Sequence, residues 1–372
     1  MKKIFLVNFL IFIIGLFFTE IIFGKWFSEK KYYCSYVLCK TNYKFKHEIF
    51  SSEYNGIYSK NSDGLRGNFD SNLNIKVLAL GGSTTDQRYL SDNDTWPNQL
   101  QKYFEKIDKN FKVANAGIDG QSTIGHIWNF KNWFTNIENL KPKIIIFYIG
   151  INDLIPIKKS HYDFAKIEFK FNKVYFKQLI KNNSVIYYLS NTIYSNLFGR
   201  KQILKFNKNI LSSNIEYSIK PSISKTNLEL YEKKYLKKNV NFRLNVLLNE
   251  TQKYNAIPLF ITQGTKRWIK KNNLYYGLIS ENKKTEMKID NKIININSAD
   301  LGILEEKFSN NVINFCNEKK IFCIDGFNSF ELKINDTYDL MHLNNLGSKK
   351  IAKKIFEKII KNKELNYKLN AN

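Results

Sequence analysis

The residues best suited to chemistry in this chain are a serine, an aspartate and a histidine. Ser83 follows Gly81 and Gly82, which let the backbone turn sharply and present a hydroxyl group. Asp339 and His342 are close enough in sequence for one loop to present both side chains. The carboxylate would accept a hydrogen bond from imidazole Nδ1, which leaves Nε2 to take a proton from Ser83. These residue types indicate nucleophilic catalysis by a serine hydroxyl.

The turn at residues 81–85 is a weak signal by itself, because glycine-serine turns are common. It is not a Walker loop, because no lysine follows the last glycine. It is not the G-x-S-x-G nucleophile elbow, because Thr85 stands at the last position. The turn alone is compatible with a nucleophile and with a phosphate-binding loop.

Short β-rich apolar runs alternate with helical patterns along the chain, which predicts βαβ units and a parallel sheet. After Asp94, the residues Trp96, Leu100 and Phe104 fall on one helical face, and the last helix begins near Asn345. We therefore expect an α/β flavodoxin-like three-layer sandwich with a five-stranded parallel sheet. The expected strands are residues 76–80, 111–115, 144–149, 258–262 and 321–324.

Polar segments follow the first three expected strands, where an open α/β sheet binds its ligands. The first strand ends at the Ser83 turn, the second runs into residues 116–122, and the third ends at residues 150–153. A fourth polar segment, with Asp339 and His342, precedes the last helix.

These four segments, in this order, resemble the conserved blocks of the SGNH/GDSL hydrolase family, spaced over residues 77–350. Gly120 matches the glycine of the second block, and Asn152 matches the asparagine of the third, G-x-N-D. The segments 63–67 and 94–97 resemble membrane-anchored members that act on surface glycans. The chain departs from the family pattern at Gly82, where aspartate is typical, and in a large insertion after Asn152.

The resemblance implies a serine ester hydrolase. Ser83 would attack an ester carbonyl, His342 would act as general base and then protonate the leaving alcohol, and Asp339 would orient His342. The N–H groups of Ser83 and Gly120 would form an oxyanion hole with the Asn152 amide. This chemistry needs no metal and no cofactor.

Other candidate residues are expected to have structural roles. Asp325 follows the last strand and is the main rival of Asp339, but no histidine is near it in sequence. Asp153 is expected to be a structural hydrogen-bond acceptor. The remaining histidines lack paired ligands at metal spacing and are expected on the surface or in packing: His47, His126 and His161.

The chain is strongly basic, with 58 basic and 33 acidic residues and a net charge of +25. Nearly all of this charge is lysine, whereas phosphate and base-edge recognition favours arginine. No helix-turn-helix, zinc-finger or RNP pattern is present, so we expect no nucleic-acid partner. A bias towards AT-rich codons explains the abundance of Lys, Asn and Ile.

The N-terminus predicts a membrane anchor. Residues 4–24 are almost wholly apolar and, as a helix, span roughly 30 Å, the thickness of a hydrocarbon core. A cleaved signal peptide is the rival, but no small-residue cleavage site follows. Glu20 lies near the far end, where it can reach the interface. Flanking lysines are balanced and leave the orientation open.

Four cysteines form two close pairs, Cys34 with Cys39 and Cys316 with Cys323. Their spacing is unlike that of zinc or redox sites, so two disulfides and four buried thiols remain alternatives. We expect a single-pass membrane protein with an extracytoplasmic (periplasmic) soluble domain, where disulfides can form.

The expected organisation has four parts. Residues 1–25 form the signal anchor, 26–74 a juxtamembrane segment, and 75–360 the hydrolase domain, with a mainly helical insertion at about 155–240. Residues 361–372 are polar and are expected to form a frayed tail.

The leading functional reading is an esterase for O-acyl, in particular O-acetyl, esters of an envelope carbohydrate. The first alternative is an O-acetyltransferase of a surface polysaccharide, which would form the same acyl-Ser83 intermediate. The second alternative is a non-catalytic anchored binding protein, although no member of the triad is missing. A lipid ester is a further possible substrate, favoured only by the anchor.

Overall fold

The computed structural model divides the chain into two compact units. One comprises Met1–Leu38 and Ile167–Leu204, and the other comprises Cys39–Lys166 and Lys205–Asn372. The structure describes residues 2–24, 26–27, 33–47, 54–67, 75–156, 163, 176, 180, 183–198, 215–281 and 284–370. The four sequence blocks named above all lie in the second unit, which we call the catalytic unit.

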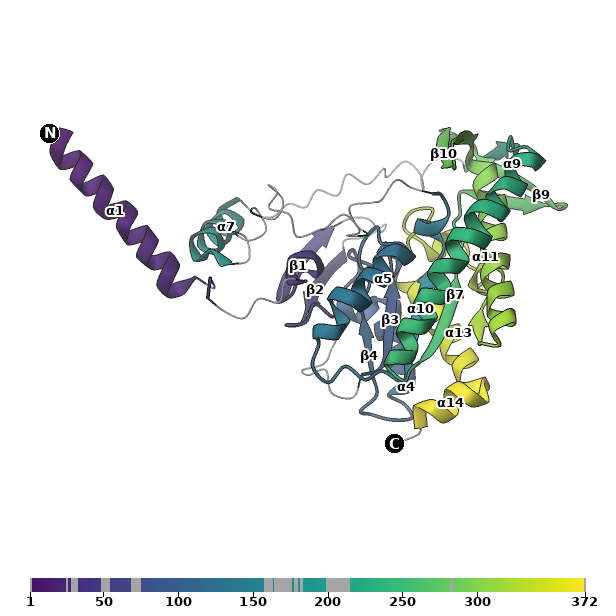
Figure 1. Cartoon of the computed structure of the whole chain (residues 1–372), viewed down its shortest axis with the longest axis horizontal. Helices are drawn as coiled ribbons and strands as arrows, with labels where there is room; N and C mark the ends of the chain where they lie inside the picture. Colours follow the sequence, from purple (N-terminus) through teal and green to yellow (C-terminus); the bar gives the residue numbers. More distant parts are fainter. Residues whose placement is uncertain are drawn as a thin grey trace. The chain divides into compact units, whose positions relative to one another are not determined.

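A five-stranded parallel sheet forms the centre of the catalytic unit (Figure 1). Its strand order is β12-β7-β5-β3-β4, which is the flavodoxin-like order. The central strand β5 is buried along its whole length, as expected for a parallel sheet covered on both faces. The bounds of the strands are β3 (Ile75–Gly81), β4 (Lys112–Asn115), β5 (Ile144–Ile149), β7 (Ile257–Thr262) and β12 (Cys323–Ile324). The predicted fold class and all five strands are confirmed.

Helices cover both faces of this sheet. On one face, α4 (Trp96–Phe104) and α13 (Asn345–Lys361) pack side chains such as Trp96 and Ile355 against Ile146 of β5. On the other face, Phe130 of α5 (Thr123–Asn132) packs against Phe147, whose ring stacks on Phe260 of β7. Successive side chains of β5 therefore point to opposite faces of the sheet, as in any pleated strand.

The C-terminal residues are helical, contrary to the expected frayed tail. Helix α14 (Lys363–Asn370) follows α13 directly. Leu365 and Leu369, one helical turn apart, are buried in the same core cluster as Ile359 of α13. Most residues of the tail are polar because they lie on the exposed side of this helix. The two buried leucines were therefore too few to predict a packed helix from the sequence.

Smaller elements surround the central sheet. The hairpin strands β1 (Thr41–His47) and β2 (Tyr54–Lys60) pair antiparallel, as do β10 (Thr285–Ile289) and β11 (Lys292–Ile296). A third sheet has the order β6-β9-β8, from β6 (Tyr217–Ile219), β8 (Trp268–Lys271) and β9 (Leu274–Leu278). The short helices described in this unit include α3 (Ser83–Asp86), η1 (Asp92–Asp94), η2 (Phe134–Asn136), η3 (Ile151–Asp153), η6 (Ile279–Glu281), α12 (Gly326–Ser329) and η7 (Ile334–Asp336).

The described part of the insertion is mainly helical. It includes α9 (Lys225–Leu230) and the π-helix η5 (Tyr231–Val240), which leads directly into α10 (Asn241–Lys253). Only the short strand β6 interrupts this pattern among the described residues of the insertion. The expected site candidate His161 lies outside the described residues.

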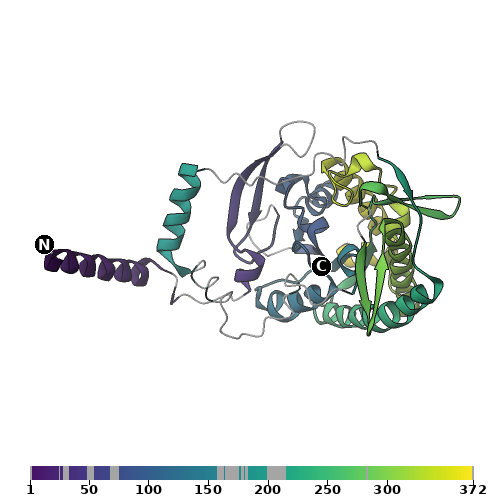
Figure 2. The ribbon, with the colours of Figure 1, turned by 90° about the horizontal axis from the view of Figure 1, so that it is seen from above.

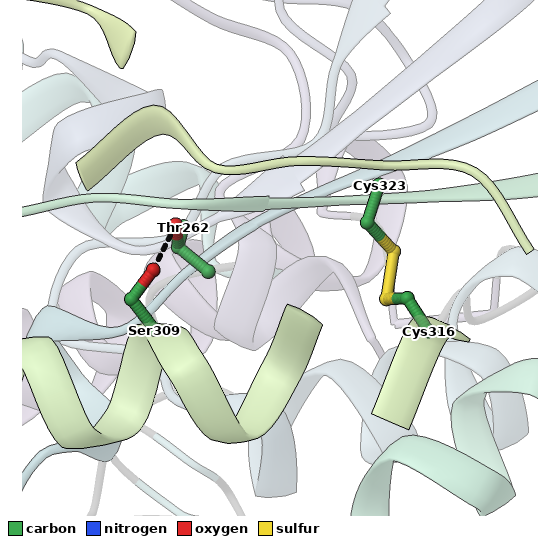
Figure 3. Close-up of a disulfide and its surroundings, with 4 residues drawn as sticks. All are labelled: Thr262, Ser309, Cys316 and Cys323. Carbon is green, nitrogen blue, oxygen red and sulfur yellow. Dashed lines mark hydrogen bonds between the residues drawn. A yellow bond between two sulfur atoms is a disulfide. The ribbon is translucent and has the colours of Figure 1, made fainter. Parts of the chain in front are cut away.

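A disulfide joins helix α11 (Ser298–Lys319) to the edge strand β12 (Figure 3). It links Cys316 to Cys323 with a Cα–Cα distance of 6.2 Å, within the reach of such a bond. On the same helix, Ser309 Oγ hydrogen bonds to Thr262 Oγ1 of β7 at 2.7 Å. Cys34 and Cys39 are disulfide-bonded as well. The sequence left disulfides and buried thiols as alternatives, and the structure has disulfides.

The unit formed by Met1–Leu38 and Ile167–Leu204 contains α1 (Lys2–Phe23), α2 (Cys34–Val37) and α7 (Val185–Phe198). Among the described residues, α1 is the one helix long and apolar enough to cross a membrane. Many of its large apolar side chains are exposed, and those of Phe12 and Phe17 are more than half exposed. By length and composition, α1 is a candidate membrane span, and a signal sequence has the same properties.

Candidate active site

Ser83, His342 and Asp339 form one hydrogen-bonded chain at the carboxyl end of β3. Ser83 begins α3 directly after the strand. The Nε2 atom of His342 lies 2.8 Å from Ser83 Oγ, and its Nδ1 atom lies 2.7 Å from Asp339 Oδ2. The structure therefore joins two segments that are far apart in sequence into the geometry of a serine hydrolase triad.

The loop that carries Asp339 and His342 is held by its own hydrogen bonds. Asp339 Oδ1 accepts hydrogen bonds from the backbone N–H of Met341 at 2.7 Å and of His342 at 2.6 Å. The N–H of Tyr338 donates to the carbonyl of His342 at 3.0 Å. The ring of Tyr338 also stacks on the imidazole, with 5.6 Å between ring centres and 7° between the planes. These contacts limit the orientations open to the imidazole.

The charge of Asp339 is stabilised within this loop. Burial disfavours ionisation, but hydrogen bonds from the His342 side chain and from the backbone N–H groups outweigh it and hold the pKa of Asp339 below its usual value. Asp339 is therefore a carboxylate at neutral pH. In that state it can hold Nδ1–H of His342 and stabilise an imidazolium during proton transfer.

The expected oxyanion donors Asn152 and Gly120 both lie beside one cavity. Asn152 Nδ2 donates to the carbonyl of Gln121 at 3.0 Å, which orients the amide, and its second N–H can serve an incoming oxygen. Gly120 has φ = 72°, a backbone conformation that favours glycine. Ser83 occupies the first position of α3, where a backbone N–H has no partner within the helix.

The segment after Ser83 is held by a buried arginine that sequence reasoning did not single out. Arg66 is 1% exposed, and its guanidinium donates to the carbonyls of Asp86, Gln87 and Leu90. Its Nε atom also pairs with Asp92 Oδ1 at 2.6 Å. One side chain thus ties together the turn that follows Ser83. The only sequence signal was the segment 63–67, which contains Arg66.

A second buried contact reaches the same turn from the hairpin β1–β2. Asp86, three residues after Ser83, accepts a hydrogen bond from Tyr58 Oη at 2.9 Å. The ammonium group of Lys60 lies 3.8 Å from the same carboxylate. Burial lowers the pKa of Lys60, and Asp86 opposes that shift. Both partners come from β2, so the expected juxtamembrane segment supports the turn that follows Ser83.

A cavity of about 330 Å³ lies beside the expected oxyanion residues. Its polar lining includes Asn152, Asp163, Asn239 and Arg243, and its apolar lining includes Phe242. Asn239 belongs to the π-helix η5, and the insertion therefore contributes to this cavity. The lining residues are Gly120, Ser122, Ile124, Asn152, Ile155, Pro156, Asp163, Tyr235, Asn239, Phe242 and Arg243.

Two buried carboxylates support the wall of this cavity. Asp153 accepts hydrogen bonds from the backbone and hydroxyl of Thr123 and pairs with Arg243 at 3.2 Å. Asp163 accepts hydrogen bonds from the backbone and hydroxyl of Ser122. Burial raises the pKa of Asp163 despite these donors. Asp153 thus acts as a structural acceptor, as expected.

The other candidates lie apart from the triad. Asp325 caps α12 and accepts hydrogen bonds from Ser309 Oγ at 3.0 Å and Asn328 Nδ2 at 2.6 Å, whereas His342 Nδ1 meets Asp339. His126 is buried in α5, near Phe147, and burial lowers its pKa to about 4. His47 pairs with Tyr54 in the hairpin β1–β2.

Comparison with known proteins identifies the family of this chain. The family model of GDSL-like lipases and acylhydrolases matches residues 77–355, which include every residue of the hydrogen-bonded chain. No curated protein matches the sequence.

Several solved structures are similar at low identity. A lipolytic protein of the G-D-S-L family from Veillonella parvula is 11% identical, with a TM-score of 0.40 over 77% of this chain and 100% of that chain. TesA is 11% identical, with a TM-score of 0.37 over 78% of this chain and 98% of that chain. A catalytic mutant of Axe2, an acetylxylan esterase from Geobacillus stearothermophilus, is 11% identical, with a TM-score of 0.41 over 77% and 94%.

The family match covers most of the chain and all four sequence blocks. The chain belongs to the family of GDSL-like lipases and acylhydrolases and is an SGNH-type serine ester hydrolase.

Proposed function

We propose that this enzyme removes O-acyl groups, in particular O-acetyl groups, from an envelope carbohydrate, with Ser83 as nucleophile. The observation that carries this proposal is the hydrogen-bonded chain from Ser83 Oγ through His342 to Asp339. In the proposed enzyme, α1 anchors the catalytic unit to a membrane.

The first step forms an acyl-enzyme. Ser83 Oγ attacks the ester carbonyl while His342 Nε2 takes the hydroxyl proton, and Asp339 stabilises the resulting imidazolium. The carbonyl oxygen becomes an oxyanion, which accepts hydrogen bonds from the N–H groups of Ser83 and Gly120 and from Asn152 Nδ2. The tetrahedral intermediate then releases the sugar alcohol, which receives its proton from His342.

The second step releases the acyl group. His342 takes a proton from water, the water oxygen attacks the acyl-Ser83 carbonyl, and the proton returns to Ser83 Oγ as the carboxylic acid leaves. The side chains of His342 and Asp339 are 20% and 23% exposed, so water can reach this end of the site. This access is what the hydrolytic step requires.

The lining of the cavity beside Asn152 favours a polar substrate such as a sugar over a lipid. A long lipid chain favours a continuous apolar wall, whereas this lining alternates apolar side chains with Asn239, Tyr235 and Arg243. Phe242, which lines the cavity, is 67% exposed and therefore accessible to a ligand. A sugar ring presents both hydroxyl groups and apolar faces, which suits a wall of this kind.

Two features support an anchored, extracytoplasmic enzyme. The helix α1 has the length and composition of a membrane span. The disulfide between Cys316 and Cys323, with Cys34 and Cys39 also disulfide-bonded, is typical of an oxidising compartment.

The test of this function follows the acyl group. The full-length protein in detergent is incubated with an O-acetylated polysaccharide, with and without a deacetylated acceptor glycan, and free acetate and acetylated acceptor are quantified. We expect acetate release that the acceptor does not change and that Ser83→Ala abolishes. Ser280→Ala, which alters an exposed serine outside the site, is the matched control. Acetyl transfer to the acceptor in place of acetate release would favour the acetyltransferase alternative.

A further inference from the structure

Glu20, the single acidic residue of the apolar helix α1, contacts the beginning of helix α7. Its carboxylate accepts hydrogen bonds from the Ser184 hydroxyl and from the backbone N–H groups of Val185 at 3.3 Å and Ile186 at 3.0 Å. It also accepts a hydrogen bond from the indole of Trp26 at 2.7 Å. The carboxylate therefore has polar partners even though the helix that carries it is otherwise apolar.

These contacts place the beginning of α7 at the end of the candidate membrane span. Glu20 lies three residues before the last residue of α1, Phe23. A carboxylate is costly in the hydrocarbon core but is tolerated near the interface. Tryptophan is enriched at membrane interfaces, and Trp26 binds the same carboxylate. Glu20, Trp26 and Ser184 are thus residue types that suit the membrane–water interface.

Helix α7 has the chemistry of a segment that lies in such a layer. Its 14 residues include no charged side chain. At 1.5 Å per residue the helix is about 21 Å long, too short to cross a hydrocarbon core of about 30 Å. Ile186, Leu189 and Ile193 fall on one face by their spacing. Leu189 is 48% exposed and Ile193 is 57% exposed, although both are apolar.

Helix α7 also has a suitable direction. Figure 2 shows that α7 runs across the direction of α1 at the end of that helix, and both helices belong to one compact unit. If α1 crosses the bilayer, a helix across its end lies along the membrane surface. The hydrogen bonds to Glu20 hold α7 at that depth.

We propose that α7 is a second membrane contact, an interfacial helix whose face with Leu189 and Ile193 is buried in lipid beside the end of α1. This inference rests on the proposed anchoring by α1. Lipid is the occupant because the exposed apolar side chains of α7 continue those of α1, which lipid covers if α1 spans the bilayer. The catalytic unit is connected to α7 on both sides in sequence.

The test measures which solvent surrounds Ile193. The full chain carries one introduced cysteine, labelled with a fluorophore, in vesicles of phosphatidylethanolamine and phosphatidylglycerol. No native cysteine is free among the described residues, so the label reports the introduced site. Ile193→Cys is the test position and Phe12→Cys reports α1. Ile293→Cys, on β11 of the catalytic unit, is the matched control because Ile293 is 59% exposed, close to the 57% of Ile193.

Each label is quenched either by iodide in water or by nitroxide groups on the lipid chains. We expect lipid nitroxides to quench the labels at positions 12 and 193 severalfold more than the label at 293, and iodide to show the reverse order. Lipid quenching at 12 with iodide quenching at 193 would overturn the inference while the anchor stands. A label at 193 shielded from both quenchers would mean that protein covers α7 and would also overturn it. Iodide quenching at 12 would contradict the anchor itself.

Discussion

Gly82 lies directly against the side-chain amide of Asn152. A Cβ atom on Gly82 would lie 2.1 Å from Asn152 Nδ2, a distance that real side chains do not adopt. A side chain at position 82 and this placement of the amide exclude each other.

The first prediction follows from that contact. Gly82→Ala should displace Asn152 from its hydrogen bond to Gln121 and lower turnover, with little change in the free energy of unfolding. Steady-state kinetics and thermal unfolding of the variant measure the two effects. Native turnover in Gly82→Ala would show that the position of Asn152 does not matter for catalysis.

The second prediction concerns the oxyanion role of Asn152. Asn152→Ala should lower turnover by roughly 10²–10³, because one donor to the developing oxyanion is lost, with little change in KM. The double variant with Gly82→Ala should be little worse than Asn152→Ala alone, because both changes act on the same donor. An effect confined to KM would assign Asn152 to substrate binding instead.

The sheet could be predicted from the sequence because its strands are short, continuous apolar runs bounded by polar turns. Residues 144–149 are all apolar or aromatic, and this pattern has few alternatives to a buried strand. Ser83, Asp339 and His342 could be named because their residue types stand in recognisable blocks. Helix α14 was missed because only Leu365 and Leu369 in it face the core.

The support around the site could not be predicted in the same way. Arg66 meets Asp86 and Leu90 only because β2, α3 and the chain after them fold together, and no local pattern records that contact. The cavity takes Asn239 from a π-helix inside an insertion that carries no motif. Contacts of this kind depend on tertiary packing rather than on local sequence.

The third prediction tests the buried guanidinium. Arg66→Lys should lower the free energy of unfolding by about 1–3 kcal/mol, because lysine cannot satisfy all the buried carbonyls that Arg66 now serves. Turnover should fall as well, because these carbonyls follow Ser83. Arg88→Lys, at a residue with a 37% exposed side chain, is the control and should cost less. Urea unfolding of both variants makes the comparison, and equal losses would contradict this role of Arg66.

The fourth prediction concerns pH. Burial lowers the pKa of His126 to about 4 from 6.5, so between these values the unfolded chain binds a proton that the folded chain does not. Stability therefore falls as pH decreases through this window, by up to about 3 kcal/mol at 1.36 kcal/mol per pKa unit. His126→Phe, which keeps an aromatic ring beside Phe147, should lack this component. Parallel acid-induced losses in both proteins would argue against a neutral buried His126.

The central claim is that Ser83 forms the covalent acyl-enzyme, and intact-protein mass spectrometry after an acid quench tests it directly. During turnover of an activated acetyl ester, the native protein should carry one acetyl group, which peptide mapping should locate on Ser83. Ser83→Ala should carry none, and its turnover should fall by a factor on the order of 10⁶. An acetyl group on another residue, or a Ser83→Ala variant that folds and turns over at the native rate, would contradict the account.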